Sequence, residues 1–330
     1  MILSAGKRAD QVKDSDRYPC AGGKAAYVRR PSLVLLNGLA EQTETWFQNE
    51  HYWRRYFGVL VPNLLVYDEA AIHERISQKR PINVQYLVDQ LCLYLEQFAQ
   101  APPYHVVASS MGCKIALELA VRRPHLVARM VLLCPSGLGD LERLPIVEGV
   151  RRGDCRALVA SVFHDSRHVE AGLMRFYEER LANRRWRQGL VHTIRGTMDH
   201  SVRPLLPHVT QSTLIISGSE DRIVSPAHAE AAAEELLDGH FLSIPCCGHA
   251  PQIEKAHLVN RLVVRFLTTG IKYAKHSGRD SPAPDRHPSV SALRRPPDKI
   301  AQRERGRCGA RENAFEVGAT GADDSLRPGP

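Results

Sequence analysis

Three residue types that together perform nucleophilic catalysis occur at informative places in this 330-residue chain. Ser110 lies in an A-S-S-M-G segment at positions 108–112, where an apolar run changes at once into a helical pattern. Asp221 and His249 each follow a later apolar run of strand length. A serine hydroxyl is a weak nucleophile that needs an adjacent base, and a carboxylate can orient that base. These three residues are therefore the catalytic candidates.

The residues two before and two after each serine decide between Ser109 and Ser110. A tight strand–turn–helix junction requires small side chains at both positions, because neighbouring backbone approaches closely there. Ser110 has Ala108 and Gly112 at these positions, whereas Ser109 would have a valine and a methionine. Ser110 is thus the nucleophile candidate. The alternative is a serine that only caps the helix.

The acid and the base are selected by their places after predicted strands. Sites in parallel α/β sheets draw their residues from the carboxyl ends of the strands, which favours Asp221. Glu220 is adjacent to it and Asp140 follows the preceding predicted strand, so both are alternative acids. Among fifteen histidines, His249 is distinguished by its position after the last predicted strand, with Gly248 freeing the backbone beside it.

The elements that must position these residues alternate regularly along the chain. Continuous apolar runs of strand length alternate with segments of helical periodicity, and Asn83 is placed to cap one of the helices. This pattern predicts an α/β fold with a doubly wound, mostly parallel sheet covered on both faces. The predicted strands are 32–36, 59–61, 104–108, 130–133, 213–216 and 241–244; the predicted helices are 83–98, 114–122, 227–237 and 259–267.

Interruptions of this alternation predict the domain organisation. The sheet core is expected at 31–142 and 206–270, and the segment 143–205 between them shows only helical periodicity. Residues 1–30 have no convincing period. Residues 271–330 are rich in Pro, Arg, Gly and Asp without an apolar period, and are predicted to be a disordered basic tail.

The net charge of +8 is local rather than general. The segment 143–205 holds 12 Arg, no Lys and 7 acids, a balance of +5, and the tail 271–330 contributes +4. We therefore expect no nucleic-acid partner. The arginines of the helical segment form either a solvated surface or a clamp for an anionic substrate, since guanidinium groups bind carboxylates bidentately. Possible substrate-binding residues are Trp46, Trp186, Arg184 and Arg187, with core packing as the alternative for Trp46.

Composition excludes several other classes of protein. No apolar run reaches the roughly 18 residues of a membrane-spanning helix. Residues 1–16 contain no apolar segment typical of a secretory signal, so a cytoplasmic location with reduced thiols is expected. The eight cysteines form no C-x-x-C pair, and neither a metal site nor a cofactor is predicted.

Four segments resemble the α/β-hydrolase fold superfamily, and more narrowly its lid-bearing serine hydrolases, over roughly residues 31–270. They are L-V-L-L-N-G at 33–38, A-S-S-M-G at 108–112, G-S-E-D-R-I-V at 218–224 and G-H-A-P-Q-I-E at 248–254. The resemblance implies a Ser110–His249–Asp221 triad, because its G-x-x-D pattern selects Asp221. It also implies a helical lid inserted after the sixth strand of the sheet. The oxyanion hole is then expected from the backbone N–H groups of Leu39 and Met111.

Three features depart from the family pattern. Asn37 stands before Gly38 where the family usually has histidine, and residues 61–68 lack the family's D-x-P-G-x-G-x-S stretch. Two short strands expected before Leu33 are hard to find in residues 1–30. None of these departures touches the triad.

The expected function is that of a serine hydrolase acting on an ester, a thioester or an activated C–C bond of a small molecule. Two alternatives remain open at this point. One is acyl transfer to an acceptor other than water, and the other is a non-catalytic protein that binds a small ligand on the same fold. The oligomeric state is not predicted.

Overall fold

The structure is a computed structural model of the chain. It describes residues 17–19, 27–41, 43–97, 102–139, 155–168 and 171–269. The sequence predictions for the tail 271–330 and for the first part of the helical segment, 143–154, lie outside these residues.

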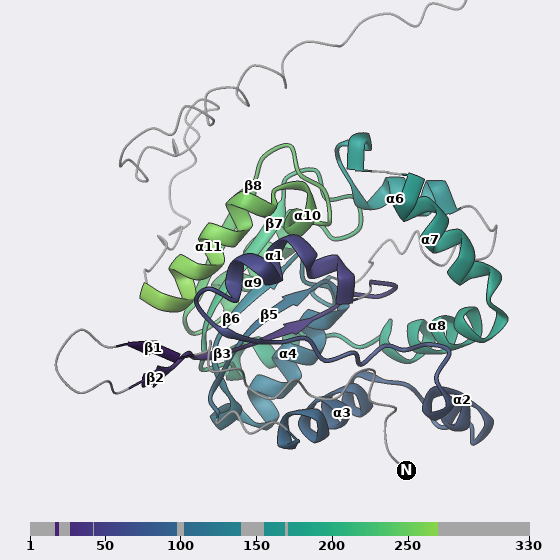
Figure 1. Cartoon of the computed structure of the whole chain (residues 1–330), viewed down its shortest axis with the longest axis horizontal. Helices are drawn as coiled ribbons and strands as arrows, with labels where there is room; N and C mark the ends of the chain where they lie inside the picture. Colours follow the sequence, from purple (N-terminus) through teal and green to yellow (C-terminus); the bar gives the residue numbers. More distant parts are fainter. Residues whose placement is uncertain are drawn as a thin grey trace, which may run out of the picture. The chain divides into compact units, whose positions relative to one another are not determined.

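A six-stranded parallel sheet forms the centre of the described fold (Figure 1). Its strands run in the spatial order β4-β3-β5-β6-β7-β8, and every neighbouring pair is parallel. The predicted α/β class with a mostly parallel sheet is thus confirmed. The strands are β3 (Ser32–Leu36), β4 (Gly58–Leu60), β5 (Tyr104–Ser109), β6 (Val127–Leu133), β7 (Ser212–Gly218) and β8 (Gly239–Ile244).

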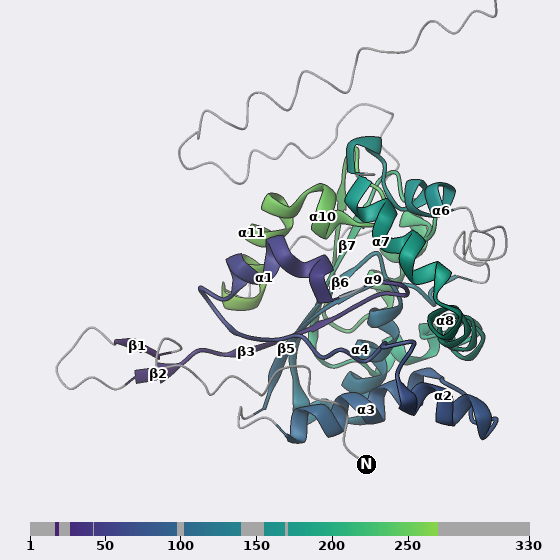
Figure 2. The same cartoon turned by 45° about the vertical axis from the view of Figure 1, so that its right-hand side comes forward.

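Side chains that alternate along the strands bury both faces of the sheet. In β3, Val34 and Leu36 join one hydrophobic cluster, whereas Leu33 and Leu35 join a second cluster on the other face. This follows from the two-residue period of a strand, and it explains why the run is apolar at every position. The first face packs against α3 (Val84–Glu96), α4 (Met111–Arg122) and α9 (Pro226–Glu235), and the second against α1 (Phe47–Trp53) and α11 (Ala256–Thr269), as Figure 2 shows.

The helix α3 begins where its capping residue predicts. Asn83 has extended backbone, and its side-chain oxygen accepts a hydrogen bond from the Tyr86 N–H at 3.0 Å. This satisfies one of the N–H groups that the first turn of a helix leaves without an intrahelical partner. The helix then buries Leu87, Leu91 and Leu95 on one stripe.

Some elements differ from the sequence predictions. β1 (Arg17–Pro19) and β2 (Tyr27–Arg29) pair antiparallel in a sheet of their own, so they do not extend the edge of the large sheet. The apolar residues 64–67 form neither helix nor strand. The short helices α1 and α2 (Ala70–Ser77) gave no clear periodic signal, because each spans only about two turns.

Between β6 and β7 the described residues contain helices and no strand. The helix α8 packs beside α2, and Trp186 on α8 contacts the ring of Tyr67 edge-on, with 5.2 Å between ring centroids. The elements of this segment are α6 (Cys155–Val162), η4 (Ser166–His168), α7 (Ala171–Ala182), α8 (Arg184–Thr197) and η5 (Arg203–His208). The remaining short helices are η2 (Thr43–Trp46), η3 (Pro124–Leu126) and α10 (Pro251–Glu254).

Within the described ranges, every helix is too short or too polar to reach across a bilayer.

Gly112, in the first turn of α4, lies against the backbone that follows β3. A Cβ at this position would be 2.6 Å from the Leu36 carbonyl oxygen and 2.7 Å from that of Asn37. Both atoms belong to backbone and cannot swing away as a side chain could. We therefore expect Gly112→Ala to lower the free energy of unfolding by about 1–3 kcal/mol, the usual cost of overpacking, as measured by urea denaturation. An unchanged denaturation midpoint would show that this close approach is not needed for the fold.

Candidate active site

Ser110 occupies a strained turn between β5 and α4. Its backbone has φ 48° and ψ −116°, a conformation that residues other than glycine rarely adopt. Two hydrogen bonds hold the turn: the Ser110 N–H donates to the Leu133 carbonyl at 2.9 Å, and the Ser110 carbonyl accepts from Cys113 N–H at 3.0 Å. Strain of this kind is typical of functional positions, because it holds one side chain clear of its neighbours.

The structure brings Ser110, His249 and Asp221 together from three distant parts of the sequence. His249 Nε2 lies 2.9 Å from Ser110 Oγ, and His249 Nδ1 lies 2.8 Å from Asp221 Oδ2. Both the histidine and the aspartate are buried, whereas the serine is half-buried. The imidazole therefore bridges a hydroxyl on one side and a carboxylate on the other, at distances that permit proton transfer.

The Asp221 carboxylate is held by further hydrogen bonds at the end of β7. Its Oδ1 accepts from the N–H groups of Ile223 at 2.8 Å and Val224 at 3.0 Å. Burial on its own would raise the pKa of Asp221. The adjacent His249 and these two N–H donors outweigh burial and hold the pKa below its usual value. The carboxylate is therefore ionised near neutral pH and can accept the Nδ1 proton of His249.

The other two acid candidates do not share this position. Glu220 is exposed, and among the described residues its carboxylate accepts a hydrogen bond from the Ser219 hydroxyl alone, at 3.3 Å. Asp140 lies outside the described residues. Of the acids in the described ranges, Asp221 is the one that contacts His249 Nδ1.

The loop that carries His249 is fastened to the end of α6. His249 N–H donates to the Val162 carbonyl at 2.8 Å. The Glu254 carboxylate accepts from Gly248 N–H at 2.7 Å and, through its other oxygen, from the N–H groups of His164 and Asp165 at 3.0 Å each. Glu254 thus supports the histidine loop and also ties it to the segment between β6 and β7.

The expected oxyanion-hole groups lie on the two segments nearest Ser110. Gly38 is so close to the nucleophile that a Cβ on it would be 3.1 Å from Ser110 Cβ. The next residue, Leu39, belongs to a turn in which Ala40 has φ 59°. Within the described ranges, neither Leu39 N–H nor Met111 N–H donates to a protein acceptor. Met111 is also the first residue of α4, where the helix dipole favours negative charge.

Glu41 was not identified as a site residue from the sequence. Its Oε2 accepts from Gly38 N–H and its Oε1 from the Ser109 hydroxyl, both at 2.8 Å. Burial raises the pKa of Glu41, and the hydrogen bonds from Gly38 and Ser109 and the nearby His249 only partly oppose that shift. The sequence contained one signal for Glu41, namely a carboxylate three residues after Gly38 in a loop that follows an apolar strand.

The four proposed substrate-binding residues do not meet at Ser110. Trp46 is fully buried in the cluster on the α1 and α11 face, and its Nε1 donates to Asn37 Oδ1 at 2.7 Å. Trp186 is buried in the other cluster. Arg184 and Arg187 are exposed, and Arg187 donates to the Leu181 carbonyl at 2.6 Å. Both tryptophans occupy packing roles, which was the alternative for Trp46, because their rings fill the core on either side of the sheet.

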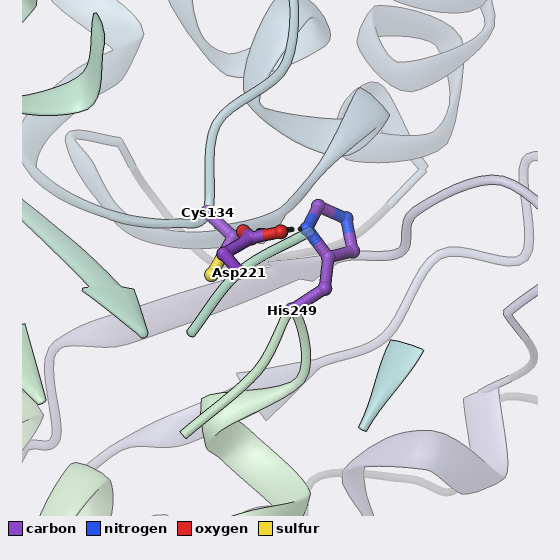
Figure 3. A group of neighbouring side chains, drawn as sticks. All are labelled: Cys134, Asp221 and His249. Atoms are coloured by element: carbon purple, nitrogen blue, oxygen red, sulfur yellow. Dashed lines mark hydrogen bonds and ion pairs between the residues drawn. The ribbon is translucent and has the colours of Figure 1, made fainter. Parts of the chain in front are cut away.

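One side-chain group has the composition of a metal site. Cys134, Asp221 and His249 are neighbouring side chains (Figure 3), and each offers a ligand atom. These atoms lie within 4.8 Å of one another. Burial raises the pKa of the Cys134 thiol well above its usual value, and the Asp221 charge adds to this. The thiol is therefore protonated, and the Asp221–His249 hydrogen bond already uses the facing atoms. This chemistry fits a proton relay better than a cation site.

The cysteines correct one expectation from composition. Cys246, in the histidine loop, is disulfide-bonded, whereas reduced thiols were expected. The error arose because residue spacing cannot reveal which cysteines the fold brings together. Free cysteines within the described ranges are Cys92, Cys113, Cys134 and Cys247.

A parallel sheet that presents a strained serine to a histidine and a buried aspartate defines the class of α/β-fold serine hydrolases. The acid follows β7 and the base follows β8, so the chain order Ser110, Asp221, His249 is that of this class.

Comparisons with known proteins agree with this class. The family model described as alpha/beta hydrolase fold matches residues 31–256. The chain therefore belongs to the alpha/beta hydrolase fold family.

Similar proteins include a lipase, a dienoate hydrolase and a serine hydrolase of known structure, all at low identity. A monoacylglycerol lipase, abhd6-B of Xenopus laevis, is 24% identical over 279 residues, which cover 76% of this chain and 79% of that protein. The 2-hydroxy-6-oxo-6-phenylhexa-2,4-dienoate hydrolase of Comamonas testosteroni is 27% identical over 177 residues, 49% of this chain and 62% of that enzyme. A serine hydrolase structure from Cycloclasticus zankles shares the fold, with a TM-score of 0.63 and 18% identity over 74% of this chain and 92% of that one.

Proposed function

We propose that the chain hydrolyses carboxylic esters of small molecules through Ser110, His249 and Asp221. The observation that carries the proposal is the continuous hydrogen-bonded chain from Ser110 Oγ through His249 to Asp221. A hydroxyl, an imidazole and an ionised carboxylate in this order form a complete nucleophile, base and orienting acid.

In the first half of the reaction, Ser110 Oγ attacks the ester carbonyl carbon while His249 Nε2 takes the hydroxyl proton. The carbonyl π electrons move to oxygen and form a tetrahedral oxyanion. When this intermediate collapses, the bond to the leaving alcohol breaks, and His249 returns the proton to the alkoxide oxygen. The products are the free alcohol and an acyl group esterified to Ser110. Asp221 holds the Nδ1 proton of His249 throughout and stabilises the charged imidazolium.

In the second half, water replaces the alcohol. His249 Nε2 takes one proton from water as the water oxygen attacks the acyl carbon. Collapse of the second oxyanion breaks the bond to Ser110 Oγ, which regains a proton from His249. The carboxylic acid leaves and the enzyme returns to its starting state. No group beyond these residues and water is needed to balance the atoms.

The oxyanion is proposed to be stabilised by the N–H groups of Leu39 and Met111. Support comes from the position of Gly38 against Ser110 and from the absence of a protein acceptor for either N–H among the described residues. Donors that are already directed at the reacting oxygen stabilise the transition state without further reorganisation.

The helical segment 143–205 is proposed to be a lid over this site. Support comes from the bonds of this segment to the histidine loop: the Val162 carbonyl accepts from His249 N–H, and the N–H groups of His164 and Asp165 donate to Glu254. The proposed clamp for an anionic substrate has no comparable support from Arg184 and Arg187, which are exposed on α8.

Similarity to both lipases and a dienoate hydrolase leaves two bond types to compare. We favour esters because the alignment with the monoacylglycerol lipase covers more of this chain, 76% against 49%. Activated C–C bonds, thioesters and transfer to an acceptor other than water use the same acyl-enzyme and are separated by assay. Initial rates with p-nitrophenyl esters of increasing chain length, an acyl thioester and a 2-hydroxy-6-oxodienoate compare the bond types, and added alcohol acceptors test transfer.

The nucleophile itself is tested with a fluorophosphonate probe and peptide mapping by mass spectrometry. We expect stoichiometric labelling of Ser110, because only a serine activated by a base reacts rapidly with such a probe. Hydrolysis of one ester series above the background rate is the second expected result. Labelling at another residue, or no labelling with no turnover, would favour the alternative of a non-catalytic ligand-binding protein.

A further inference from the structure

A buried chain of polar groups runs beside the proposed triad and is not part of it. Glu41 accepts from Gly38 N–H and from the Ser109 hydroxyl, both at 2.8 Å. The Ser109 oxygen in turn accepts from Gln252 Nε2 at 3.3 Å. Ser109 and Gln252 are both fully buried. These hydrogen bonds therefore link the loop after β3, the end of β5 and the helix α10.

The residues joined by these hydrogen bonds lie close in sequence to residues of the proposed catalytic site. Gly38 precedes Leu39, Ser109 precedes Ser110, and Gln252 follows His249 by three residues. The mechanism uses none of these linking side chains. Glu41 is half-buried, and removing a carboxyl group from water is costly unless hydrogen bonds compensate, so an apolar residue would be the simpler choice if position 41 served packing alone.

Packing does not enclose the loop that carries Gly38 on every side. A small cavity lies against it, lined by Asn37 and Glu41 together with Asn63, Ile115 and neighbouring apolar residues. Where close packing is interrupted, hydrogen bonds must define the backbone conformation. The bond from Gly38 N–H to Glu41 fixes the orientation of the Asn37–Gly38 peptide group, which directly precedes the peptide group that carries the Leu39 N–H.

We propose that Glu41 is a positioning residue that holds the oxyanion loop in register with the nucleophile elbow and, through Ser109 and Gln252, with the histidine loop. This inference rests on the proposed function, because it assigns Leu39 N–H to the oxyanion. The carboxyl group itself touches neither substrate nor Ser110. It keeps the Leu39 donor at the place where negative charge develops.

Gln252, the last member of this hydrogen-bonded series, makes a conservative variant of Glu41 possible. Gln252 Oε1 is buried and accepts no hydrogen bond from the described residues. In Glu41→Gln, the new amide oxygen can accept from Gly38 while the new amide N–H donates to Ser109 Oγ. The Ser109 hydroxyl then donates to Gln252 Oε1 once that amide turns over. All three links persist: the Gly38 N–H still donates to residue 41, and the two links to Ser109 reverse their direction of donation. Glu41→Ala removes the two links made by residue 41.

The activity test compares Glu41→Ala, Glu41→Gln and Ser109→Ala with the wild type on the best ester. We expect Glu41→Ala to lower kcat by about 10–100-fold with KM within about threefold, somewhat less than the loss of a complete oxyanion donor. Glu41→Gln is expected to retain kcat within about fivefold, since the chain of bonds is kept. Ser109→Ala should fall between them. Glu50→Ala is the matched control: Glu50 is a half-buried glutamate of α1 whose carboxylate pairs with Arg54, and this variant should match the wild type.

A second measurement does not depend on turnover. Hydrogen exchange followed by mass spectrometry on a peptide spanning Gly38 should show faster exchange in Glu41→Ala and wild-type protection in Glu41→Gln. Equal kcat in the wild type and Glu41→Ala, or equal losses in the alanine and glutamine variants, would overturn the inference. So would unchanged protection of the Gly38 amide. If Glu41→Ala does not fold, a wild-type kcat in Ser109→Ala has the same consequence. Failure of the proposed function would appear separately, as a wild-type chain that the fluorophosphonate probe does not label.

Discussion

Ser110→Ala is expected to lower kcat with the best ester substrate by at least about 10⁴-fold, leaving only the contribution of binding and the oxyanion hole. The methyl group cannot attack the carbonyl, and it gives His249 Nε2 no proton to take. Because the turn at Ser110 has a positive φ, alanine adopts it at a cost similar to that of serine, and the fold should persist. Steady-state kinetics with product release followed over hours would measure the residual rate.

A matched serine serves as the control for this variant. Ser219 stands in the turn after β7, where its hydroxyl contacts only the exposed Glu220. Ser219→Ala should keep the wild-type kcat and the wild-type denaturation midpoint. If Ser110→Ala also kept its kcat, hydrolysis would have to proceed by direct attack of water, and the acyl-enzyme mechanism would be excluded.

Asp221→Asn is expected to lower kcat by about 10³–10⁴-fold with a small change in KM, because it leaves the imidazole in place but in the wrong tautomer. An asparagine amide N–H would donate to His249 Nδ1, so the remaining ring proton would sit on Nε2. That nitrogen faces Ser110 Oγ at 2.9 Å and could no longer accept the serine proton. Loss of the carboxylate charge would also leave the imidazolium without its counter-ion.

A substitution at the neighbouring Glu220 distinguishes the effect of a charge near the site from the effect of the specific contact between Asp221 and His249. Glu220→Gln removes one negative charge beside Asp221 but no contact to His249. It should therefore keep at least about half of the wild-type kcat, since an exposed charge is strongly screened. Equal losses in Glu220→Gln and Asp221→Asn would show that overall charge, rather than the Nδ1 hydrogen bond, supports the reaction.

Local sequence identified the elements of the sheet because each carries its signal within a few residues. Continuous apolar runs gave β3, β5, β6, β7 and β8 within a few residues of their ends, and Asn83 marked the start of α3. The segments that failed were short. β1 and β2 span three residues each, too few for a period to be recognised, and their pairing with each other depends on contacts outside the large sheet.

The serine of the site was selected by a local requirement. The nucleophile elbow needs small residues on either side of the serine, and Gly112 fulfils this against the carbonyls of Leu36 and Asn37. Asp221 and His249 were selected by their positions after strands and by the family pattern. The carboxyl ends of parallel strands lie at one edge of the sheet, and β7 and β8 are neighbours in it. Asp221 and His249, which follow these strands, therefore lie near each other.

The sequence by itself therefore determined the fold class, the serine at the elbow and the order of the three candidate side chains, because local propensity and strand direction decide each of these. Only the tertiary structure revealed Glu41 beside Gly38 and Ser109, the bond of Glu254 to the end of α6, and the packing roles of Trp46 and Trp186. Each of these depends on contacts between residues far apart in the chain, or on the path of a loop. No propensity or period records them, since burial and hydrogen bonding are decided by what the fold brings alongside.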